Sequence, residues 1–191
     1  MEIKGIIFDF FGVLSSGVAD EWFTKNAPQI IEKEYRPKFL DPFDSGEMST
    51  TAMFERLAAI SGKTGEEVAK EWVSFAHIDW PMIALLKEFE KKYNVAVCTN
   101  VGGEFLRSVL AVNNLTGTLK PLIVSSEVRL VKPHPEIYQL VLKTLSLEAA
   151  ETVFIDDRIE NIQGAEAVGI RGIQFTSLAQ LHADLSKLGV S

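Results

Sequence analysis

Four groups of polar residues lie at or just after the end of an apolar run. Their side chains have the chemistry of an oxygen-rich ligand site. They are Asp9, the pair Thr99 and Asn100, Lys132, and the pair Asp156 and Asp157. Three carboxylates in one cleft repel one another, and the single lysine supplies only one positive charge against them. A divalent cation offsets the remaining charge, and an all-oxygen site is typical of magnesium. If the fold brings these residues together, they predict a magnesium site.

The first of these residues, Asp9, belongs to an apolar stretch that organises the chain. Residues 3–14 are rich in β-branched and aromatic side chains, which predicts a strand buried on both faces in a parallel sheet covered by helices. A lone carboxylate at the end of such a strand destabilises the fold by several kcal/mol unless a partner offsets its charge. Asp9 therefore indicates a ligand site, the alternative being a turn cap or a pair with a lysine, and Gly12 lets the backbone turn away after it.

The rest of the chain supplies the elements that position the other polar groups. Residues 95–98, 122–124, 153–155 and 173–175 form short apolar runs, and segments with helical periodicity lie between them. Strands that alternate with helices predict an α/β fold with a doubly wound parallel sheet. The carboxyl ends of parallel strands lie at one rim of the sheet, where ligands bind in open α/β folds. We therefore expect the polar groups to meet at that rim.

Residues 15–80 follow a different pattern, with helical periodicity and no strand. We predict four short helices, the second of which ends before Pro37, followed by a loop at residues 42–46. Thr64 and Glu67 have the spacing of a capping box at the start of the fourth helix.

The chain is thus predicted to fold as two domains. An α/β core contains residues 1–14 and 81–191, and a small helical domain contains residues 15–80. The helical domain is predicted to have an aromatic core of its own, made of Trp22, Phe23, Trp72 and Phe75.

Composition limits the classes of protein. The chain has 191 residues, 47% of them hydrophobic and 24% charged, a mixture typical of a globular fold. A net charge of −7 without clustered Lys and Arg argues against a nucleic-acid surface. No apolar run has the length of a membrane span, and the signal-peptide pattern is absent. The single cysteine, Cys98, fits a reducing compartment and a place in the core. We expect a soluble cytoplasmic protein with no nucleic-acid or membrane partner, and no pattern predicts an oligomeric state.

The order and spacing of the polar groups resemble the four motifs of the haloacid dehalogenase (HAD) superfamily of hydrolases. The resemblance covers the whole chain and implies a Rossmann-like α/β core, with residues 15–80 as the small helical cap that one subgroup inserts after the first motif. It also implies Mg²⁺ and a phosphatase that acts on a small phosphorylated metabolite through an aspartyl-phosphate intermediate. The matching residues are Asp9-Phe10-Phe11-Gly12-Val13, Thr99-Asn100, Lys132-Pro133, and Asp156-Asp157 with Asn161.

Carried over to this sequence, the resemblance assigns the metal site. Asp9 would be both the nucleophile and a metal ligand, and Asp157 the second carboxylate ligand. Asp156 would act through a water molecule or orient the site. The family also uses a backbone carbonyl as a ligand, here that of Phe11. Asn161 would hold the loop that carries the two aspartates.

The resemblance also assigns the catalytic residues that meet the phosphate group. Thr99 and the amide of Asn100 would hold phosphate oxygens, helped by the start of the helix after Gly102 and Gly103. Lys132 would neutralise charge on the nucleophile and on the transferring phosphoryl group.

Phe11 departs from the phosphatase pattern, which has a second aspartate at this position. That aspartate protonates the leaving group and then activates water, and such acid-base help is worth roughly 10²–10⁴ in rate. Candidate replacements for the acid are His134 and the acidic residues of the cap, namely Asp20, Glu21, Asp41, Asp44 and Glu47.

Three functions therefore remain open. The first is a magnesium phosphatase that takes its acid from the cap or cleaves substrates with easy leaving groups. The second is a 2-haloacid dehalogenase, whose first motif has an aromatic residue at this position and whose halide leaving group needs no proton. Asp156 and Asp157 oppose this function, because dehalogenases need no metal. The third is a catalytically silent protein that keeps the fold for binding.

Overall fold

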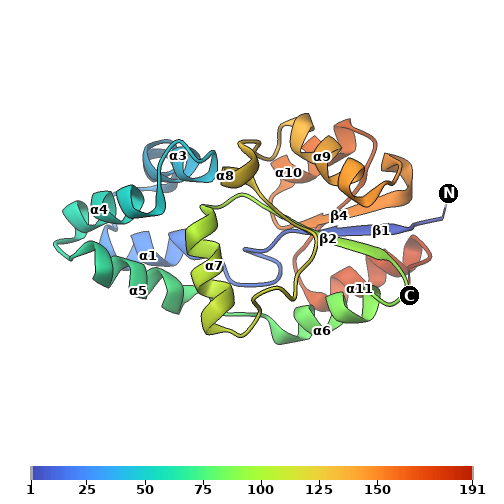
Figure 1. Cartoon of the computed structure of the whole chain (residues 1–191), viewed down its shortest axis with the longest axis horizontal. Helices are drawn as coiled ribbons and strands as arrows, with labels where there is room; N and C mark the ends of the chain where they lie inside the picture. Colours follow the sequence, from blue (N-terminus) through green and yellow to red (C-terminus); the bar gives the residue numbers. More distant parts are fainter. Residues whose placement is uncertain (1, 191) are drawn as a thin grey trace.

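The computed structural model describes residues 2–190 and contains a five-stranded parallel sheet (Figure 1). The strands are β1 (Gly5–Phe8), β2 (Asn94–Thr99), β3 (Leu122–Val124), β4 (Thr152–Asp156) and β5 (Arg171–Gln174). Their order is β3-β2-β1-β4-β5, so β1 lies at the centre, paired with β2 and β4. All four residues of β1 are buried. The predicted doubly wound α/β sheet is confirmed.

Helices cover both faces of this sheet (Figure 1). One face is covered by α6 (Trp80–Phe89) and α11 (Leu178–Lys187). The other face is covered by α9 (Pro135–Leu145) and α10 (Ile159–Ala167). A 3₁₀ turn (Ala149–Glu151) precedes β4. The side chains of β1 alternate between the two layers, as the pleat requires. Ile6 and Phe8 join the apolar cluster under α6 and α11, whereas Ile7 joins the cluster under α9 and α10. Cys98 is buried in this second cluster as a free thiol, as predicted for a core residue.

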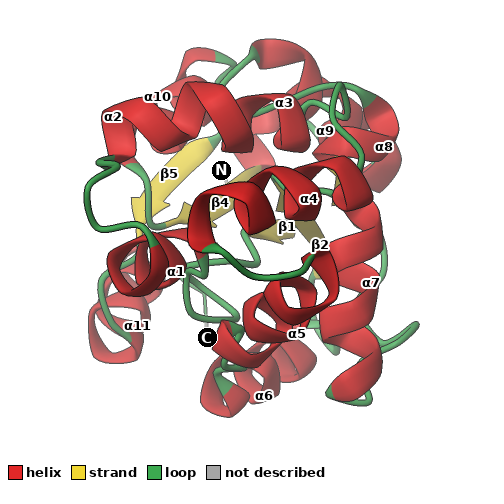
Figure 2. Cartoon of the chain, turned by 90° about the vertical axis from the view of Figure 1, so that its left-hand side faces the viewer, coloured by secondary structure: helices red, strands yellow, loops and turns green. Residues whose placement is uncertain are grey.

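The helical segment, residues 15–80, lies beyond the carboxyl ends of the strands, and Figure 2 looks onto its outer side. It contains α1 (Ala19–Asn26), α2 (Glu32–Tyr35), a π-helical turn (Arg36–Leu40), α3 (Asp41–Asp44), α4 (Thr50–Ser61) and α5 (Gly65–Phe75). The predicted capping box of α5 is confirmed. Thr64 Oγ1 accepts the N–H of Glu67 at 3.2 Å, and the Glu67 carboxylate accepts the N–H of Thr64 at 2.8 Å.

The second helix ends before Pro37, as predicted, because α2 ends at Tyr35, whereas Pro42 lies inside helical structure where a loop was predicted. Pro37 and Pro42 each lie in the first turn of their element, where the missing N–H is not needed. The predicted loop at residues 42–46 is therefore wrong for residues 42–44. As a result α3 is a short helical element that packs against α8 (Ser125–Val128), directly after β3.

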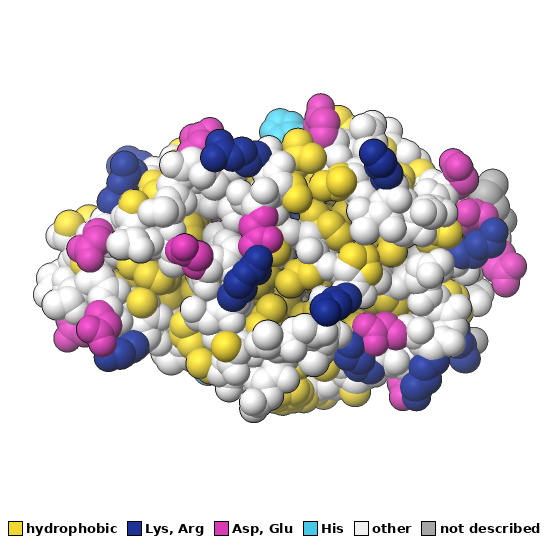
Figure 3. Space-filling model, viewed as in Figure 1, with side chains coloured by type: hydrophobic (Ala, Val, Ile, Leu, Met, Phe, Trp, Pro, Cys, Tyr) yellow, Lys and Arg dark blue, Asp and Glu magenta, His cyan; other side chains and the backbone are white. Residues whose placement is uncertain are grey.

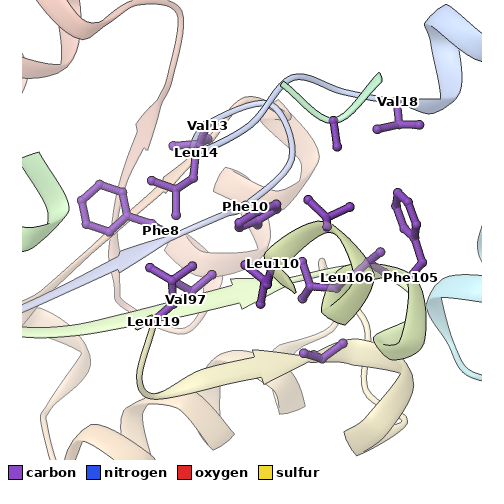
Figure 4. Close-up of a cluster of buried hydrophobic side chains, with 14 of the residues drawn as sticks. Phe8, Phe10, Val13, Leu14, Val18, Val97, Phe105, Leu106, Leu110 and Leu119 are labelled. Atoms are coloured by element: carbon purple, nitrogen blue, oxygen red, sulfur yellow. The ribbon is translucent and has the colours of Figure 1, made fainter. Parts of the chain in front are cut away.

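The aromatic side chains of the helical segment do not form a separate core. The rings of Trp22 and Phe23 meet within the segment, but Trp72 lies 5.5 Å from Phe105, measured between ring centroids. Phe105 belongs to α7 (Gly103–Val112), and one apolar cluster runs from β1 through α7 to α5. Figure 4 shows the part of this cluster that β1, β2 and α7 contribute. The predicted separate core is wrong for Trp72, because periodicity shows which face of a helix is apolar and not which neighbour covers it.

Two further observations concern helix length and surface charge. No helix within residues 2–190 combines the length and the apolar character that a membrane crossing needs. Acidic and basic side chains are interspersed on the face shown in Figure 3. That face has no extended basic patch of the kind that binds a phosphate backbone.

Candidate active site

A cavity of about 1050 Å³ lies between the carboxyl ends of the strands and the helical segment. Asp156 lies beneath its surface and is fully buried. The structure therefore brings together the residues that were predicted from the strand ends, as a parallel topology requires. The lining on the side of the sheet includes Asp9, Phe11, Thr99, Asn100, Lys132, Asp157 and Asn161.

Lys132 joins two carboxylates at the floor of the cavity. Its Nζ atom lies 2.9 Å from Asp9 Oδ1 and 2.6 Å from Asp156 Oδ2, and the side chains of Lys132 and Asp156 are completely buried. Burial alone lowers the pKa of Lys132, but the charges of Asp156 and Asp9 outweigh burial and raise the pKa above its ordinary value. Lys132 is therefore a permanent positive charge in this site.

The two carboxylates that share Lys132 have different support. Asp156 also accepts the N–H of Arg158 at 2.9 Å and Asn161 Nδ2, which lies 3.0 Å from each of its oxygens. Burial raises the pKa of Asp156, but Lys132 and these donors outweigh it and hold the pKa below its ordinary value. Burial raises the pKa of Asp9 well above its ordinary value, with Lys132 opposing only in part. A second cation beside Asp9 would favour its ionised form.

Asp157 adds a carboxylate that forms no ion pair with any described residue. Oxygen atoms of Asp9, Asp156 and Asp157 lie within 4.8 Å of one another, and Asp157 is exposed at the cavity. Partial loss of hydration and the charge of Asp156 raise the pKa of Asp157. Gly12, with φ of +88°, allows this approach, since a Cβ there would lie 2.4 Å from the Asp157 carboxylate carbon. Three hard oxygen donors at such distances fit a magnesium ion.

Thr99 and Asn100, at the end of β2, differ in what their side chains do. Thr99 Oγ1 is buried and has no hydrogen-bond partner in the described part of the chain. Asn100 instead bonds the backbone of Lys132 twice: its Nδ2 donates to the Lys132 carbonyl at 2.8 Å, and its Oδ1 accepts the Lys132 N–H at 2.9 Å. Thr99 thus offers a donor to a ligand, because buried donors normally have an acceptor. The Asn100 side chain positions Lys132.

Two backbone amides at and just before the start of α7 already have acceptors within the protein. The N–H of Val101 donates to Ser125 Oγ and the N–H of Gly103 donates to Ser126 Oγ, both at 2.9 Å. The amide of Gly103 is therefore not free to bind a phosphate oxygen, while a role of the rest of this helix start in phosphate binding stays a prediction. Sequence reasoning missed the role of Ser125 and Ser126, although two serines directly after the predicted strand at residues 122–124 were a visible signal.

Phe11 is the second residue after Asp9, and its aromatic ring faces other rings. It stacks on Phe105 with 5.7 Å between ring centroids and 9° between ring planes, and it meets Phe10 edge-on at 4.9 Å. The loop after β1 therefore presents an aromatic wall to the cavity where the family pattern has an acid.

The helical segment lines the opposite side of the cavity with apolar and ionisable groups. Trp72 Nε1 is buried there without a hydrogen-bond partner in the part of the chain that the structure describes. Asp44, the last residue of α3, has a pKa raised to about 7, mainly by burial. His134 is exposed at the rim, at the N-cap of α9. The predicted candidate acids that line the cavity are Asp20, Glu21, Asp41, Asp44 and Glu47.

Two phosphatases and a solved structure are similar to this chain over almost its whole length. The sesquiterpene phosphatase astK of Aspergillus oryzae is 28% identical over 97% of this chain and 96% of the relative. The D-ribitol-5-phosphate phosphatase of Bacteroides thetaiotaomicron is 25% identical over 96% of this chain and 97% of the relative. A crystal structure of a HAD family enzyme from Bacteroides thetaiotaomicron, in complex with magnesium and inorganic phosphate, has a TM-score of 0.75 and 23% identity, and the match covers 94% of this chain and 98% of that one.

The family model of the haloacid dehalogenase-like hydrolases matches residues 6–175. This range contains all the strand-end residues described above, together with the helical segment that faces them. The structural likeness shows the same fold independently of that match. The chain therefore belongs to the haloacid dehalogenase-like hydrolase family.

Proposed function

We propose that the protein is a magnesium-dependent phosphatase that acts on a small phosphorylated metabolite through an aspartyl-phosphate intermediate. The observation that carries this proposal is the cluster of Asp9, Asp156 and Asp157, in which one lysine offsets two carboxylates while the third faces the cavity. The two curated relatives support it because both are phosphatases. The similar crystal structure supports it because it contains magnesium and inorganic phosphate.

In this proposal, Asp9, Asp157 and the carbonyl of Phe11 hold the magnesium ion. The bound ion supplies positive charge that offsets the carboxylates and the phosphate oxygens. Asp156 is a poorer metal ligand than Asp9 or Asp157, because its oxygens are already hydrogen-bonded. Both oxygens accept a hydrogen bond from Asn161 Nδ2, and one of them also accepts a hydrogen bond from Lys132 Nζ. Asp156 instead orients Lys132 from beneath.

The residues of the chain carry out two displacements at phosphorus. The Asp9 carboxylate, held by the N–H of Phe10 at 2.7 Å and by Lys132, attacks phosphorus, and the bond to the leaving oxygen breaks. The hydroxyl of Thr99 donates to a phosphate oxygen, and Lys132 offsets the charge of the group in transfer. Water then attacks the phosphorus of the aspartyl phosphate, which releases phosphate and restores Asp9.

We further propose that residues 15–80 act as a cap on a core made of residues 1–14 and 81–191. Cap residues face the part of the cavity beyond the phosphate site, so they would meet the organic part of the substrate. Trp72 Nε1 is a free donor for a polar atom on that part. Core and cap also meet through the pair of Arg158 Nη1 and Glu32 Oε1, 3.5 Å apart.

A 2-haloacid dehalogenase is the second candidate, and the ring of Phe11 is the observation that favours it. In that reaction the Asp9 carboxylate displaces a halide, which needs no proton. Asp157 opposes this candidate, because an unpaired carboxylate at the cavity repels the carboxylate of a 2-haloacid.

A metal-dependence assay tests the proposal. Phosphate release from a panel of small phosphate esters and halide release from 2-chloropropionate are measured with millimolar Mg²⁺, after chelation, and after Mg²⁺ is restored. We expect phosphate release that is lost on chelation and returns with Mg²⁺. Halide release that survives chelation would establish the dehalogenase instead. A folded protein that turns over neither kind of substrate would exclude both and leave the binding protein.

A further inference from the structure

The proposed phosphatase needs a proton donor for the leaving group, and the inference below rests on that proposed function. Phe11 stands at the sequence position where the family pattern has this acid, and its ring stacks on Phe105. The donor must therefore come from another part of the cavity wall. Apart from Asp9 and Asp157, the acids that line the cavity are Asp20, Glu21, Asp41, Asp44, Glu47 and Glu160.

Asp44 differs from the other five acids in both exposure and pairing. Each of the others is solvent-exposed, whereas Asp44 is largely shielded inside the cavity. The carboxylate of Asp44 forms no hydrogen bond or ion pair with any other residue between 2 and 190, so it is free to meet a ligand. Three of the exposed acids already have partners, namely Asp20 with the Tyr35 hydroxyl, Asp41 with Arg36 at 3.6 Å, and Glu160 with Arg158 at 3.8 Å.

The position of Asp44 is fixed against the catalytic side of the cavity. Ser125 Oγ donates to the backbone carbonyl of Asp44 at 2.6 Å and accepts the N–H of Val101 at 2.9 Å. One serine therefore ties the end of α3 to the loop that follows Thr99. The chain stays close to the core after α3, since a Cβ on Gly46 would lie 2.5 Å from the Ser126 carbonyl oxygen.

The charges around Asp44 suit a group that changes its protonation state. Burial is the largest influence and raises its pKa to about 7. Asp41 on the same helical element raises the pKa further, while Arg36 before α3 and Lys132 and Arg158 on the core lower it. A carboxyl group with a pKa near the working pH serves as an acid in one step and as a base in the next.

We infer that Asp44 is the general acid and base of this hydrolase, in place of the aspartate that Phe11 replaces. As Asp9 forms its bond to phosphorus, the bond from phosphorus to the ester oxygen breaks, and the Asp44 proton passes to that oxygen to give the free alcohol. A water molecule then gives a proton to the Asp44 carboxylate while its oxygen attacks phosphorus. The bond from Asp9 to phosphorus breaks, phosphate leaves, and Asp44 is protonated again.

Substitution of Asp44 by asparagine tests this role through leaving groups of different basicity. An alkyl phosphate releases a strongly basic alkoxide and needs the proton, whereas p-nitrophenyl phosphate releases a stable phenolate and does not. In Asp44→Asn we expect kcat/KM for the alkyl phosphate to fall by roughly 10²–10⁴ and that for p-nitrophenyl phosphate to change far less. The asparagine keeps the backbone carbonyl that Ser125 binds, so the position of α3 is retained.

Two further variants separate acid catalysis from a structural role. Glu34→Gln removes an exposed acid of the helical segment that does not line the cavity, and it should leave both kcat/KM values unchanged. Adding Phe11→Asp to Asp44→Asn returns a carboxyl group to the position used in the family, and it should restore part of the activity on the alkyl phosphate.

The pH profile is the second readout. For the wild type, kcat/KM on the alkyl phosphate should decline as the pH rises past about 7, because Asp44 must be protonated to act. This decline should disappear in Asp44→Asn.

The outcomes distinguish this inference from the proposed function. Equal losses of kcat/KM on alkyl and aryl phosphates in Asp44→Asn, or no loss on either, with the wild type active, would overturn the role of Asp44 alone. A wild type that cleaves neither phosphate in the presence of Mg²⁺ would overturn the phosphatase itself.

Discussion

The two walls of the cavity hold their charges in different ways. On the side of the sheet, Lys132 and Asp156 are completely buried, and each oxygen of Asp156 accepts at least one hydrogen bond. On the side of the helical segment, most acids are exposed, and a typical pair such as Arg36 with Asp41 lies at the surface with 3.6 Å between charged atoms. Asp44 is the exception on that side, because it is shielded and has no charged partner in contact.

This difference separates the parts of the reaction that every phosphate ester shares from those that depend on the substrate. Attack on phosphorus needs fixed charges at fixed distances, and buried, fully hydrogen-bonded groups provide them. Protonation of the leaving group and contact with the organic part vary among substrates, and they are assigned here to residues of the helical segment. Mutations on the two walls should therefore have different kinds of effect.

The largest effect is expected from Asp9→Asn on the sheet side. An amide cannot attack phosphorus, so phosphate release should fall by about 10⁴ or more. Burial raises the pKa of Asp9, which means that the charged form of Asp9 opposes folding at neutral pH. In the absence of metal, the midpoint of thermal unfolding of Asp9→Asn should therefore equal or exceed that of the wild type. Steady-state assays and thermal unfolding check both parts. Asp41→Asn, on the exposed wall, serves as the control, and retained turnover in Asp9→Asn would place the nucleophile elsewhere.

Asp156→Asn makes the same chemical change at the other partner of Lys132 and should have the opposite effect on stability. Removal of the carboxylate leaves buried Lys132 with a weaker partner, and the free energy of unfolding should fall by about 3 kcal/mol. Glu160→Gln, which breaks an exposed pair with Arg158, should cost only about 0–1 kcal/mol. Denaturant unfolding measures both values. Equal losses in the two variants would contradict the proposed contrast between the walls.

Thr99→Val replaces a hydroxyl by a methyl group of similar volume. Because Thr99 Oγ1 has no hydrogen-bond partner among the described residues, the free energy of unfolding should be unchanged or slightly higher. Loss of its hydrogen bond to a charged phosphate should lower kcat/KM by roughly 10–100-fold, the equivalent of about 1.5–3 kcal/mol. Denaturant unfolding and steady-state kinetics on one phosphate ester test the two parts. Unchanged kinetics would remove Thr99 from the phosphate site.

The smallest effect concerns Asp44 and the pH dependence of stability. Its pKa is about 7 in the folded protein and near 3.8 in the unfolded chain, so the folded state binds more protons between these values and loses stability as the pH rises through them. Asp44→Asn has no carboxyl group at this position and should not lose stability in this way as the pH rises. It should exceed the wild type in stability by about 1–2 kcal/mol at pH 8, after allowance for solvent screening, and by much less at pH 4. Thermal unfolding at the two pH values checks this, and a pH-independent difference would contradict it.

Local sequence patterns predicted much of the secondary structure and of the sheet. The strands at whose carboxyl ends Asp9, Thr99 and Asp156 lie were visible as apolar runs, and parallel topology alone required these polar ends to meet. The capping box at Thr64 was equally visible, because a cap depends only on residues three apart. The predictions that failed, the loop at Pro42 and the separate core at Trp72, concern places where a local signal competes with contacts from distant parts of the chain.

What the sequence determined by itself was the sheet, its helices and the set of chemically active residues, because periodicity and residue type act over a few neighbouring positions. Only the tertiary structure decided how these residues are paired: Lys132 with two carboxylates, and Ser125 with Asp44. It also decided which of the acids that line the cavity from the helical segment is partly buried. These outcomes depend on contacts between residues far apart in the chain, such as the 81 positions that separate Asp44 from Ser125. No local pattern encodes the burial or the distance on which the pKa values and roles of these groups depend.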